Sequence, residues 1–195
     1  MNASFTKRFG AFLIDILIIL FISSLITGLL PQNKDIPKLQ KELTDYTKIT
    51  DLNNFNLDKY ISSSADIRYS LDNALIPYTI IIMLIYIGYY VVFAFFRESK
   101  TVGRSLFKIK VVKEDGNHIK INDLLIRTLI VEGLFVTIIN LTLIFILKPY
   151  SYFLITYLTE LIYIISLIII GFMVLYRKDK KALHDIITKT YVKEG

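Results

Sequence analysis

Four long apolar stretches constrain the fold of this chain more than any other feature of its sequence. They occupy residues 9–30, 75–96, 126–147 and 152–176. A helix needs about 20 apolar residues to cross the hydrocarbon core of a bilayer, because each residue advances the helix by about 1.5 Å. Backbone polar groups in lipid must be satisfied within the segment, which favours helices over open strands. The sequence therefore predicts an all-α integral membrane protein, with a four-transmembrane-helix bundle in a single domain of residues 1–195.

The first apolar stretch has an alternative interpretation as the core of a secretory signal peptide. Residues 9–30 form a longer run than the usual core of about 7 to 15 residues, and no small-x-small cleavage site precedes Pro31. We therefore predict a retained span.

Composition and charge exclude several classes of function. The chain has 195 residues, 54% of them hydrophobic, and a formal net charge of +6. Its lysines and arginines flank the apolar stretches, which indicates a membrane surface and the lipid bilayer as partner, and argues against nucleic acid. Cysteine is absent, so the sequence offers no disulfide, thiolate metal site or cysteine nucleophile.

The distribution of basic residues predicts the orientation in the membrane. Sixteen of them fall into the N-terminal tail, residues 97–127 and the tail 177–195, whereas the 31–74 loop has six basic and seven acidic residues. Because cytoplasmic loops carry the excess of Lys and Arg, we predict that both termini are cytoplasmic and that the 31–74 loop is external. This loop contains the helix-like DIPKLQKELTDY and is interpreted as a small external cap or a partly disordered segment.

The segment between the second and third spans predicts a small cytoplasmic β-hairpin at about 105–121. Two short alternating runs, near 106–113 and 118–121, flank an Asp-Gly pair that favours a tight turn. Asn122 is predicted to cap the helix that continues into the third span.

The C-terminal tail predicts two further cytoplasmic pieces. Residues 181–187 have the pattern of a short amphipathic helix, and TKTYVKE after it is strand-like. Because an isolated hairpin is only marginally stable, we expect this last strand to pair with the hairpin.

Charged residues inside the predicted spans require partners, because charge in lipid is costly. Arg8, Ala11 and Asp15 share one helical face, but the backbones of Arg8 and Asp15 are about 10 Å apart, so each needs a partner on another helix. Asp15 is either a titrating group in a proton or cation relay, or a carboxylate locked by another helix. Glu132 lies near Arg127 and is predicted to reach the interface, and Glu160 has no evident partner.

Two further patterns are too weak to predict chemistry. The pair His184-Asp185 resembles half of a catalytic dyad or metal site, but no third ligand or nucleophile lies at a useful spacing. The stretch TVGRS has too few glycines for a phosphate-binding loop. We therefore expect no enzymatic activity, no catalytic residue, no cofactor and no metal site.

Tyrosines near the predicted span ends are interpreted as aromatic belts, at positions 78, 89, 90, 150, 152 and 176.

Three motifs together resemble the RDD family of small multi-pass bacterial membrane proteins. RFGAFLID is similar to the family's opening Arg-x-x-Ala-x-x-x-Asp, KTVGRSLFKIKVV to its Thr-Pro-Gly-Lys stretch, and RKDKKALHDIITKTYV to its closing Leu-His-Asp segment. The matching residues are Arg8, Asp15, Thr101, Gly103, Arg104, Val111, Leu183, His184, Asp185 and Thr190. Val102 replaces the usual proline and Lys189 a common glycine, and the external loop is long for the family. The resemblance implies a bacterial cell membrane location. The family is generally described as of unknown role, with transport suggested, and cation/proton antiport for some members.

Two functional hypotheses follow from the spans, their charges and the resemblance. One is transport of a small cation or proton past Asp15, with a homo-oligomer as the expected state because four spans are few for a pathway. The other is a non-transporting scaffold or accessory protein in which the charged residues are structural; there we expect Arg8 to meet Asp185. The candidate polar network comprises Arg8, Asp15, Thr101, Gly103, Arg104, Arg127, Glu132, His184 and Asp185.

Overall fold

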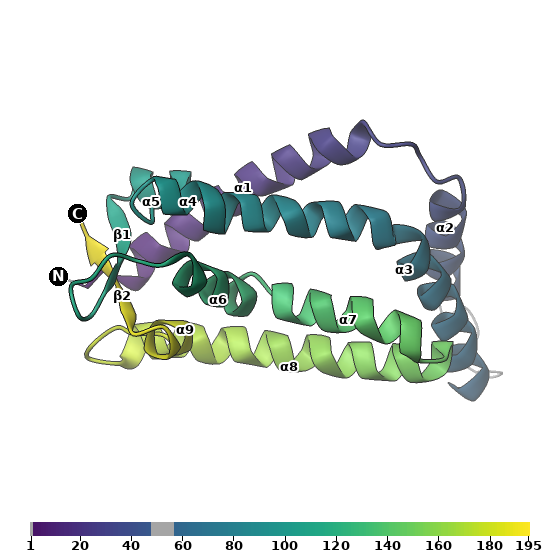
Figure 1. Cartoon of the computed structure of the whole chain (residues 1–195). Helices are drawn as coiled ribbons and strands as arrows, with labels where there is room; N and C mark the ends of the chain where they lie inside the picture. The colour runs from purple at the N-terminus through teal and green to yellow at the C-terminus, as the bar shows by residue number, and fades with distance from the viewer. Residues whose placement is uncertain (1, 48–56) are drawn as a thin grey trace.

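The computed structural model describes residues 2–47 and 57–195 and is mostly helical, with a small two-stranded sheet at one end (Figure 1). Its elements in chain order are α1 (Phe5–Gly28), α2 (Asp35–Thr47), α3 (Leu57–Ile87), the π-helix η1 (Gly88–Phe93), α4 (Ala94–Phe96), α5 (Val102–Leu106), β1 (Ile109–Lys113), α6 (Ile121–Val131), α7 (Leu134–Ile146), α8 (Pro149–Tyr176), α9 (Leu183–Ile187) and β2 (Thr190–Glu194).

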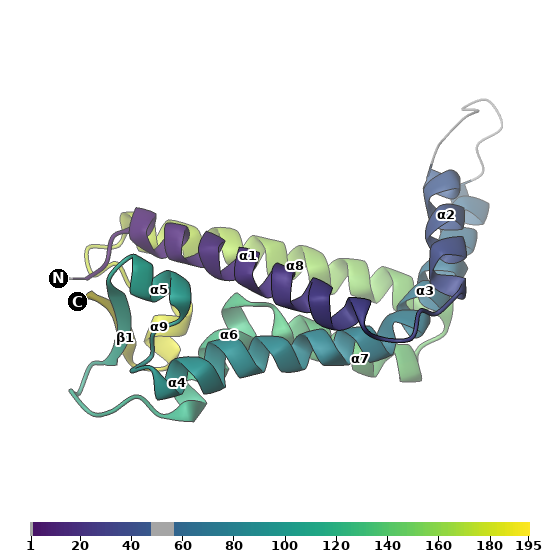
Figure 2. The ribbon, with the colours of Figure 1, turned by 90° about the horizontal axis from the view of Figure 1, so that it is seen from above.

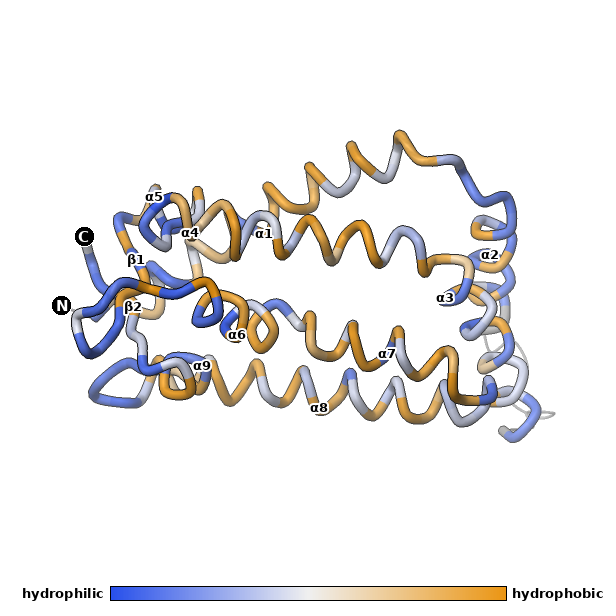
Figure 3. The backbone as a smooth tube through the Cα atoms, in the orientation of Figure 1, coloured by the Kyte–Doolittle hydropathy of each residue, from blue (hydrophilic) through white to orange (hydrophobic). Residues whose placement is uncertain are grey.

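Three helical segments in the described part are long and apolar enough to cross a membrane. They are Phe5–Gly28, Asp58–Phe96 and Pro149–Tyr176, which contain the first, second and fourth predicted spans. Their apolar side chains face outward as well as inward: Leu17 and Phe21 on α1 are 65% and 66% exposed. An exterior of this kind suits lipid as the surrounding solvent. Figure 3 shows apolar residues along these helices and polar residues concentrated at both ends of the molecule.

The third predicted span is broken, so the expectation of one uninterrupted helix over 126–147 was wrong. Helices α6 and α7 are bent by 70° relative to each other at a short break. Gly133 there adopts the left-handed conformation with φ of 71°, which a glycine tolerates without strain. The hydroxyl of Tyr163 on α8 donates to the carbonyl oxygen of Val131 at 2.8 Å. A backbone acceptor at the end of α6 is therefore satisfied by a neighbouring helix.

The sheet pairs strands that are distant in the sequence. β1 and β2 are antiparallel, with Val111 opposite Val192. The last strand was expected to pair with the hairpin, and it does pair with β1, the first of the two predicted hairpin strands. The hairpin itself at 105–121 was wrong, because residues 118–121 form no strand and the chain enters α6 there. Val111 and Val192 are both buried. The pairing of β1 with β2 therefore covers an apolar face of the sheet, which a hairpin closed by the mostly polar 113–120 segment would leave open.

Other local predictions in this half of the molecule had mixed outcomes. A helix is present within the amphipathic piece predicted over 181–187, but α9 covers only Leu183–Ile187 and buries the polar His184 and Asp185 while its apolar side chains are exposed. Helix α6 begins at Ile121, so Lys120 occupies the N-cap position that Asn122 was predicted to hold. Asp123 in the first turn accepts a hydrogen bond from the backbone nitrogen of Lys120 at 2.9 Å, which satisfies a donor at the helix start.

The predicted external loop is largely helical. α2 contains the helix-like stretch recognised in the sequence, and α3 begins at Leu57, well before the predicted start of the second span. Residues 48–56 of this loop lie outside the described residues. α2 and the first part of α3 form an arm at an angle to the bundle (Figure 2). Pro77 lies inside α3, where its ring removes one helical hydrogen bond and favours a bend.

Both termini lie at the end of the bundle that carries the sheet, opposite the arm of α2 and α3 (Figure 1). The backbone nitrogen of Ala3 donates to the carbonyl oxygen of Val192 at 2.8 Å, so the N-terminal segment lies along β2. This end therefore gathers the starts of α1 and α6, the short helices α5 and α9, and the sheet.

Candidate functional site

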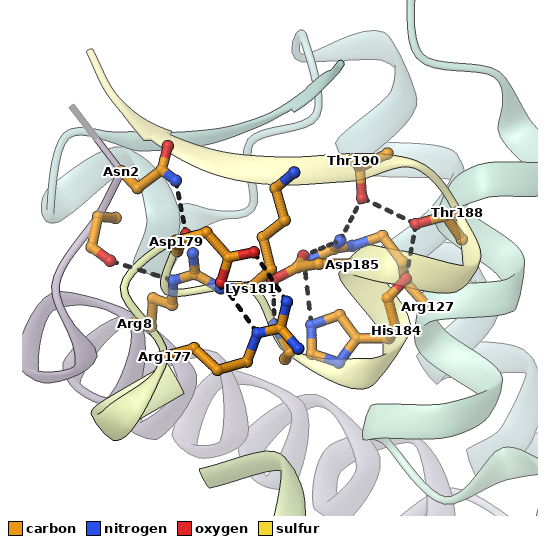
Figure 4. A network of polar contacts seen from close by, with 12 residues as sticks. Asn2, Arg8, Arg127, Arg177, Asp179, Lys181, His184, Asp185, Thr188 and Thr190 are labelled. Carbon is orange, nitrogen blue, oxygen red and sulfur yellow. Dashed lines mark hydrogen bonds and ion pairs between the residues drawn. The ribbon is translucent and has the colours of Figure 1, made fainter. Parts of the chain in front are cut away.

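The carboxylate of Asp185 joins two helices through two arginines (Figure 4). Its Oδ2 accepts a hydrogen bond from Arg8 Nη1 of α1 at 2.8 Å, and its Oδ1 accepts one from Arg127 Nη1 of α6. Oδ2 also accepts from the backbone nitrogen of Ala182 at 3.0 Å, at the start of α9. Asp185 is fully buried and the two arginine side chains nearly so. The predicted contact between Arg8 and Asp185 is therefore confirmed, and Arg127 joins it.

Threonines extend this contact into the sheet. Arg127 Nη1 also donates to the hydroxyl of Thr190 at 2.6 Å. The hydroxyl of Thr188 donates to the carbonyl of His184 at 2.7 Å, so in the 2.8 Å contact between the two hydroxyls the donor is Thr190. This chain of hydrogen bonds, visible in Figure 4, fixes α9 and β2 on the end of α6.

Burial and the neighbouring charges set the protonation of the two ionisable residues of α9. Burial favours the neutral form of a carboxyl, but the guanidiniums of Arg127 and Arg8 outweigh it and hold the pKa of Asp185 well below its usual range. Burial, together with the charge of Arg127, lowers the pKa of His184 to about 3. At neutral pH, Asp185 is therefore an anion and His184 an uncharged imidazole.

Asp15 is held by three uncharged donors. Its Oδ1 accepts hydrogen bonds from the hydroxyl of Tyr89 at 2.6 Å and the backbone nitrogen of Gly103 at 2.8 Å. Its Oδ2 accepts one from the hydroxyl of Thr101 at 2.6 Å. The carboxylate is 2% exposed and forms no ion pair within the described residues. α1 is thus fastened to η1 and to the start of α5.

Gly103 allows α5 to approach α1 closely. A Cβ atom at this position would lie 2.2 Å from the carbonyl oxygen of Ala11 and 2.8 Å from Asp15 Oδ1. Thr101 caps α5, so Val102 is the first residue of the helix. There its backbone nitrogen donates to the hydroxyl of Tyr89 at 3.2 Å, a contact that a proline would lack.

A cavity of about 330 Å³ lies between α1, α6 and α8 and borders the sheet. The charged residues that line it are Arg8, Asp15, Arg104, Arg127 and Glu132. Arg104 makes one long hydrogen bond, 3.4 Å from Nη1 to the carbonyl of Ser99, and forms no ion pair with any residue the structure describes. Glu132 stands at the break between α6 and α7 and lines the cavity, so it does not reach for the interface beside Arg127 as predicted.

All nine residues of the candidate network predicted from the sequence therefore converge on this cavity. Six line it directly, and Thr101, Gly103 and Asp185 contact the lining residues. Sequence reasoning missed Tyr89 and Tyr90, which are buried at 8% and 3% exposure instead of lying in an aromatic belt. Tyr89 and Tyr90 follow Tyr86 by one helical turn in an otherwise apolar span, and this spacing was the sequence signal from which their burial could have been predicted.

Residues at the other end of the bundle form a separate polar contact. Glu160, which had no evident partner in the sequence, lies 3.4 Å from Arg68 Nη2 of α3. Arg68 Nε also contacts Asp72 at 2.8 Å, and the hydroxyl of Tyr152 donates to the same carboxylate at 3.0 Å. Tyr152 is therefore a buried hydrogen-bond donor and not the belt residue that was predicted.

Comparison with known proteins gives one match. The family model described as the RDD family matches residues 2–189 of the chain, which include the first two motifs noted in the sequence and the third as far as Lys189. No curated protein and no solved structure matches the chain. Within the described residues, no cluster of three or more His, Cys, Asp or Glu side chains is arranged to hold a metal ion.

Proposed function

The chain belongs to the RDD family, and from this premise we propose that it is a non-transporting membrane scaffold or accessory protein. The observation that carries this proposal is the Asp185 carboxylate, whose two oxygens each bind an arginine from a different helix. Removing one member of a buried ion pair leaves an uncompensated charge, so such a contact holds its helices together strongly. The locked state of Asp15, with three uncharged donors, supports the same role.

We further propose four spans, with α6 and α7 together as one broken span, in a bacterial cell membrane. Both termini and the sheet then face the cytoplasm. The support is that the basic tails and the 97–127 segment lie at one end of the bundle, as the excess of Lys and Arg on cytoplasmic loops requires (Figure 1).

The test compares the buried arginine contact with an exposed one. Arg8→Ala removes a buried partner of Asp185, whereas Arg177→Ala removes the partner of the exposed Asp179. We expect Arg8→Ala to reduce the yield of monodisperse protein in detergent and Arg177→Ala to leave it near wild type. Proteoliposomes of the wild type should pass no more H⁺, Na⁺ or K⁺ than empty liposomes. Ion flux by the wild type that a well-folded variant loses would overturn the scaffold proposal.

A second candidate function is transport of a small cation or proton. The observation that favours it is that Asp15 and Glu132 line the same cavity. The predicted polar companion Asn140 does not support it, because its side chain accepts from the hydroxyl of Thr159 at 3.0 Å and is not part of that lining. If this candidate holds, Asp15→Asn or Glu132→Gln abolishes flux in proteoliposomes without a change in thermal stability. A homo-oligomer would then be the expected state.

A further inference from the structure

The cavity beside the arginines combines a cationic floor with apolar walls. We propose that it binds an acidic phospholipid, with the phosphate on the arginines and the acyl chains against α1 and α8. This inference concerns a ligand and goes beyond the scaffold role, which the Asp185 contacts support without it.

The floor of the cavity carries hydrogen-bond donors that have no partner among the described residues. These are Arg8 Nη2 and Arg127 Nε. The side chains of Arg8 and Arg127 are 12% and 7% exposed, so these atoms are shielded from bulk water. Buried polar groups usually have partners, and guanidinium groups match the geometry of phosphate oxygens. The donor set therefore suits an oxyanion.

The walls are apolar and come from two candidate spans. Phe5, Phe9 and Phe12 line the cavity from α1, and Leu167, Ile170 and Val174 from α8. Phe9 is 48% exposed, so the lining continues onto the outer surface of the bundle, which faces lipid. A Cβ atom at Gly171 of α8 would meet nothing within 4 Å, which is consistent with open space there. The occupant is therefore expected to enter from the bilayer.

The size of the cavity fits a headgroup and not a whole lipid. At about 330 Å³ it is at the small end of ligand pockets, which are typically about 300–1,000 Å³. A phosphate and its glycerol fill such a volume. The acyl chains then extend along the exposed apolar residues of α1 and α8, such as Leu13 and Ile168.

The charges that face the cavity predict how variants change affinity. Two arginines share the single charge of Asp185, which leaves one positive charge in excess, and Arg104 adds another that has no ion pair among the described residues. Asp15 accepts hydrogen bonds from three uncharged donors, which leave its own charge in place. Asp15 and Glu132 are the two carboxyl groups in the lining, and a negative charge on either one opposes an anion. Replacing Arg104 should therefore weaken binding, and replacing Glu132 should strengthen it.

Native mass spectrometry of the full chain in an uncharged detergent tests this proposal. Dioleoyl phosphatidylglycerol is titrated against wild type, Arg104→Gln, Glu132→Gln and Gly171→Leu, which fills the cavity without touching the arginines. We expect Arg104→Gln to weaken binding about tenfold, the scale of one lost charge-assisted hydrogen bond. Gly171→Leu should weaken binding by occupying the open space beside α8, and Glu132→Gln should tighten it. Arg177→Gln, an exposed arginine outside the lining, is the matched control and should bind as wild type does.

Two further ligands distinguish the contribution of the phosphate charge from that of the acyl chains. Dioleoyl phosphatidylcholine has the same chains without net charge and should bind at least about tenfold more weakly than the acidic lipid. Glycerol 3-phosphate has the phosphate without chains and should bind more weakly still. Equal binding of the two lipids, or an Arg104→Gln variant that binds like wild type, overturns the proposal. Binding of glycerol 3-phosphate as tight as that of the lipid overturns the assignment to a lipid.

Discussion

Gly103→Ala should separate α5 from α1, because the added methyl has no room between them. Its Cβ would lie 2.2 Å from the Ala11 carbonyl oxygen, whereas ordinary contacts begin at 3.4 Å, so the helices must move apart by about 1 Å. Overpacking of this kind costs about 1–3 kcal/mol. The shift also lengthens the hydrogen bond from the Gly103 nitrogen to Asp15, which is worth about 1.5–3 kcal/mol because the acceptor is charged.

These two effects together predict a loss of about 3–5 kcal/mol in the free energy of unfolding. For a chain of this size the corresponding decrease in Tm is roughly 10 °C. The measurement is the monodisperse fraction in size-exclusion chromatography after heating in detergent. Gly28→Ala is the control, because a Cβ atom there meets nothing within 4 Å. A Gly103→Ala variant that melts within about 2 °C of this control would show that α5 does not depend on close approach to α1.

Three other changes probe the same end of the bundle and are measured by the same thermal assay. Asp185→Asn should cost about 3–5 kcal/mol, because two buried arginines lose their counter-charge, while Asp179→Asn in an exposed pair should change little; equal effects would contradict the structural role. The pKa of His184 is lowered from 6.5 to about 3, so between these pH values the unfolded chain takes up a proton that the folded chain does not. The free energy of unfolding should therefore decline as the pH falls from 6.5 toward 3, by up to about 1.4 kcal/mol per pH unit. His184→Gln should flatten this decline, and an unchanged slope would assign it to other groups. Tyr163→Phe should cost about 1 kcal/mol by removing the donor to the Val131 carbonyl at the helix break, whereas Tyr157→Phe, at an exposed position, should be neutral.

The spans were predictable because their signal is local and strong. Runs of about 20 apolar residues leave few alternatives to a helix in lipid, and Asp15 inside such a run predicts a partner on another element. The identity of that partner was not predictable. Tyr89 and Thr101 reach Asp15 only because η1 and α5 are placed beside α1, which depends on the packing of the whole bundle.

The predicted hairpin failed for a related reason. The Asp-Gly turn is present, with Gly116 at φ of 75°, but a turn does not decide which strand pairs with β1. β2 supplies the buried Val192 opposite Val111, whereas Ile119 of the predicted second strand packs against the same apolar cluster without pairing with β1. The break in the third span could not be predicted from the sequence either. One glycine in an apolar run does not indicate a break, because the break also needs a neighbour such as Tyr163 to satisfy the exposed carbonyl.

The contact between Arg8 and Asp185 spans 177 positions of the chain, and this separation bears on biosynthesis. A ribosome adds Asp185 only after the 176 residues that follow Arg8, so the carboxylate that neutralises the guanidinium is made after every span between them. Until then the guanidinium of Arg8 at the end of the first span lacks its final counter-charge. Arg127 lacks the same carboxylate until Asp185 is made. Helix α1 can therefore enter the membrane before Asp185 is made, but this contact can fix it to α9 only after α8 has been synthesised.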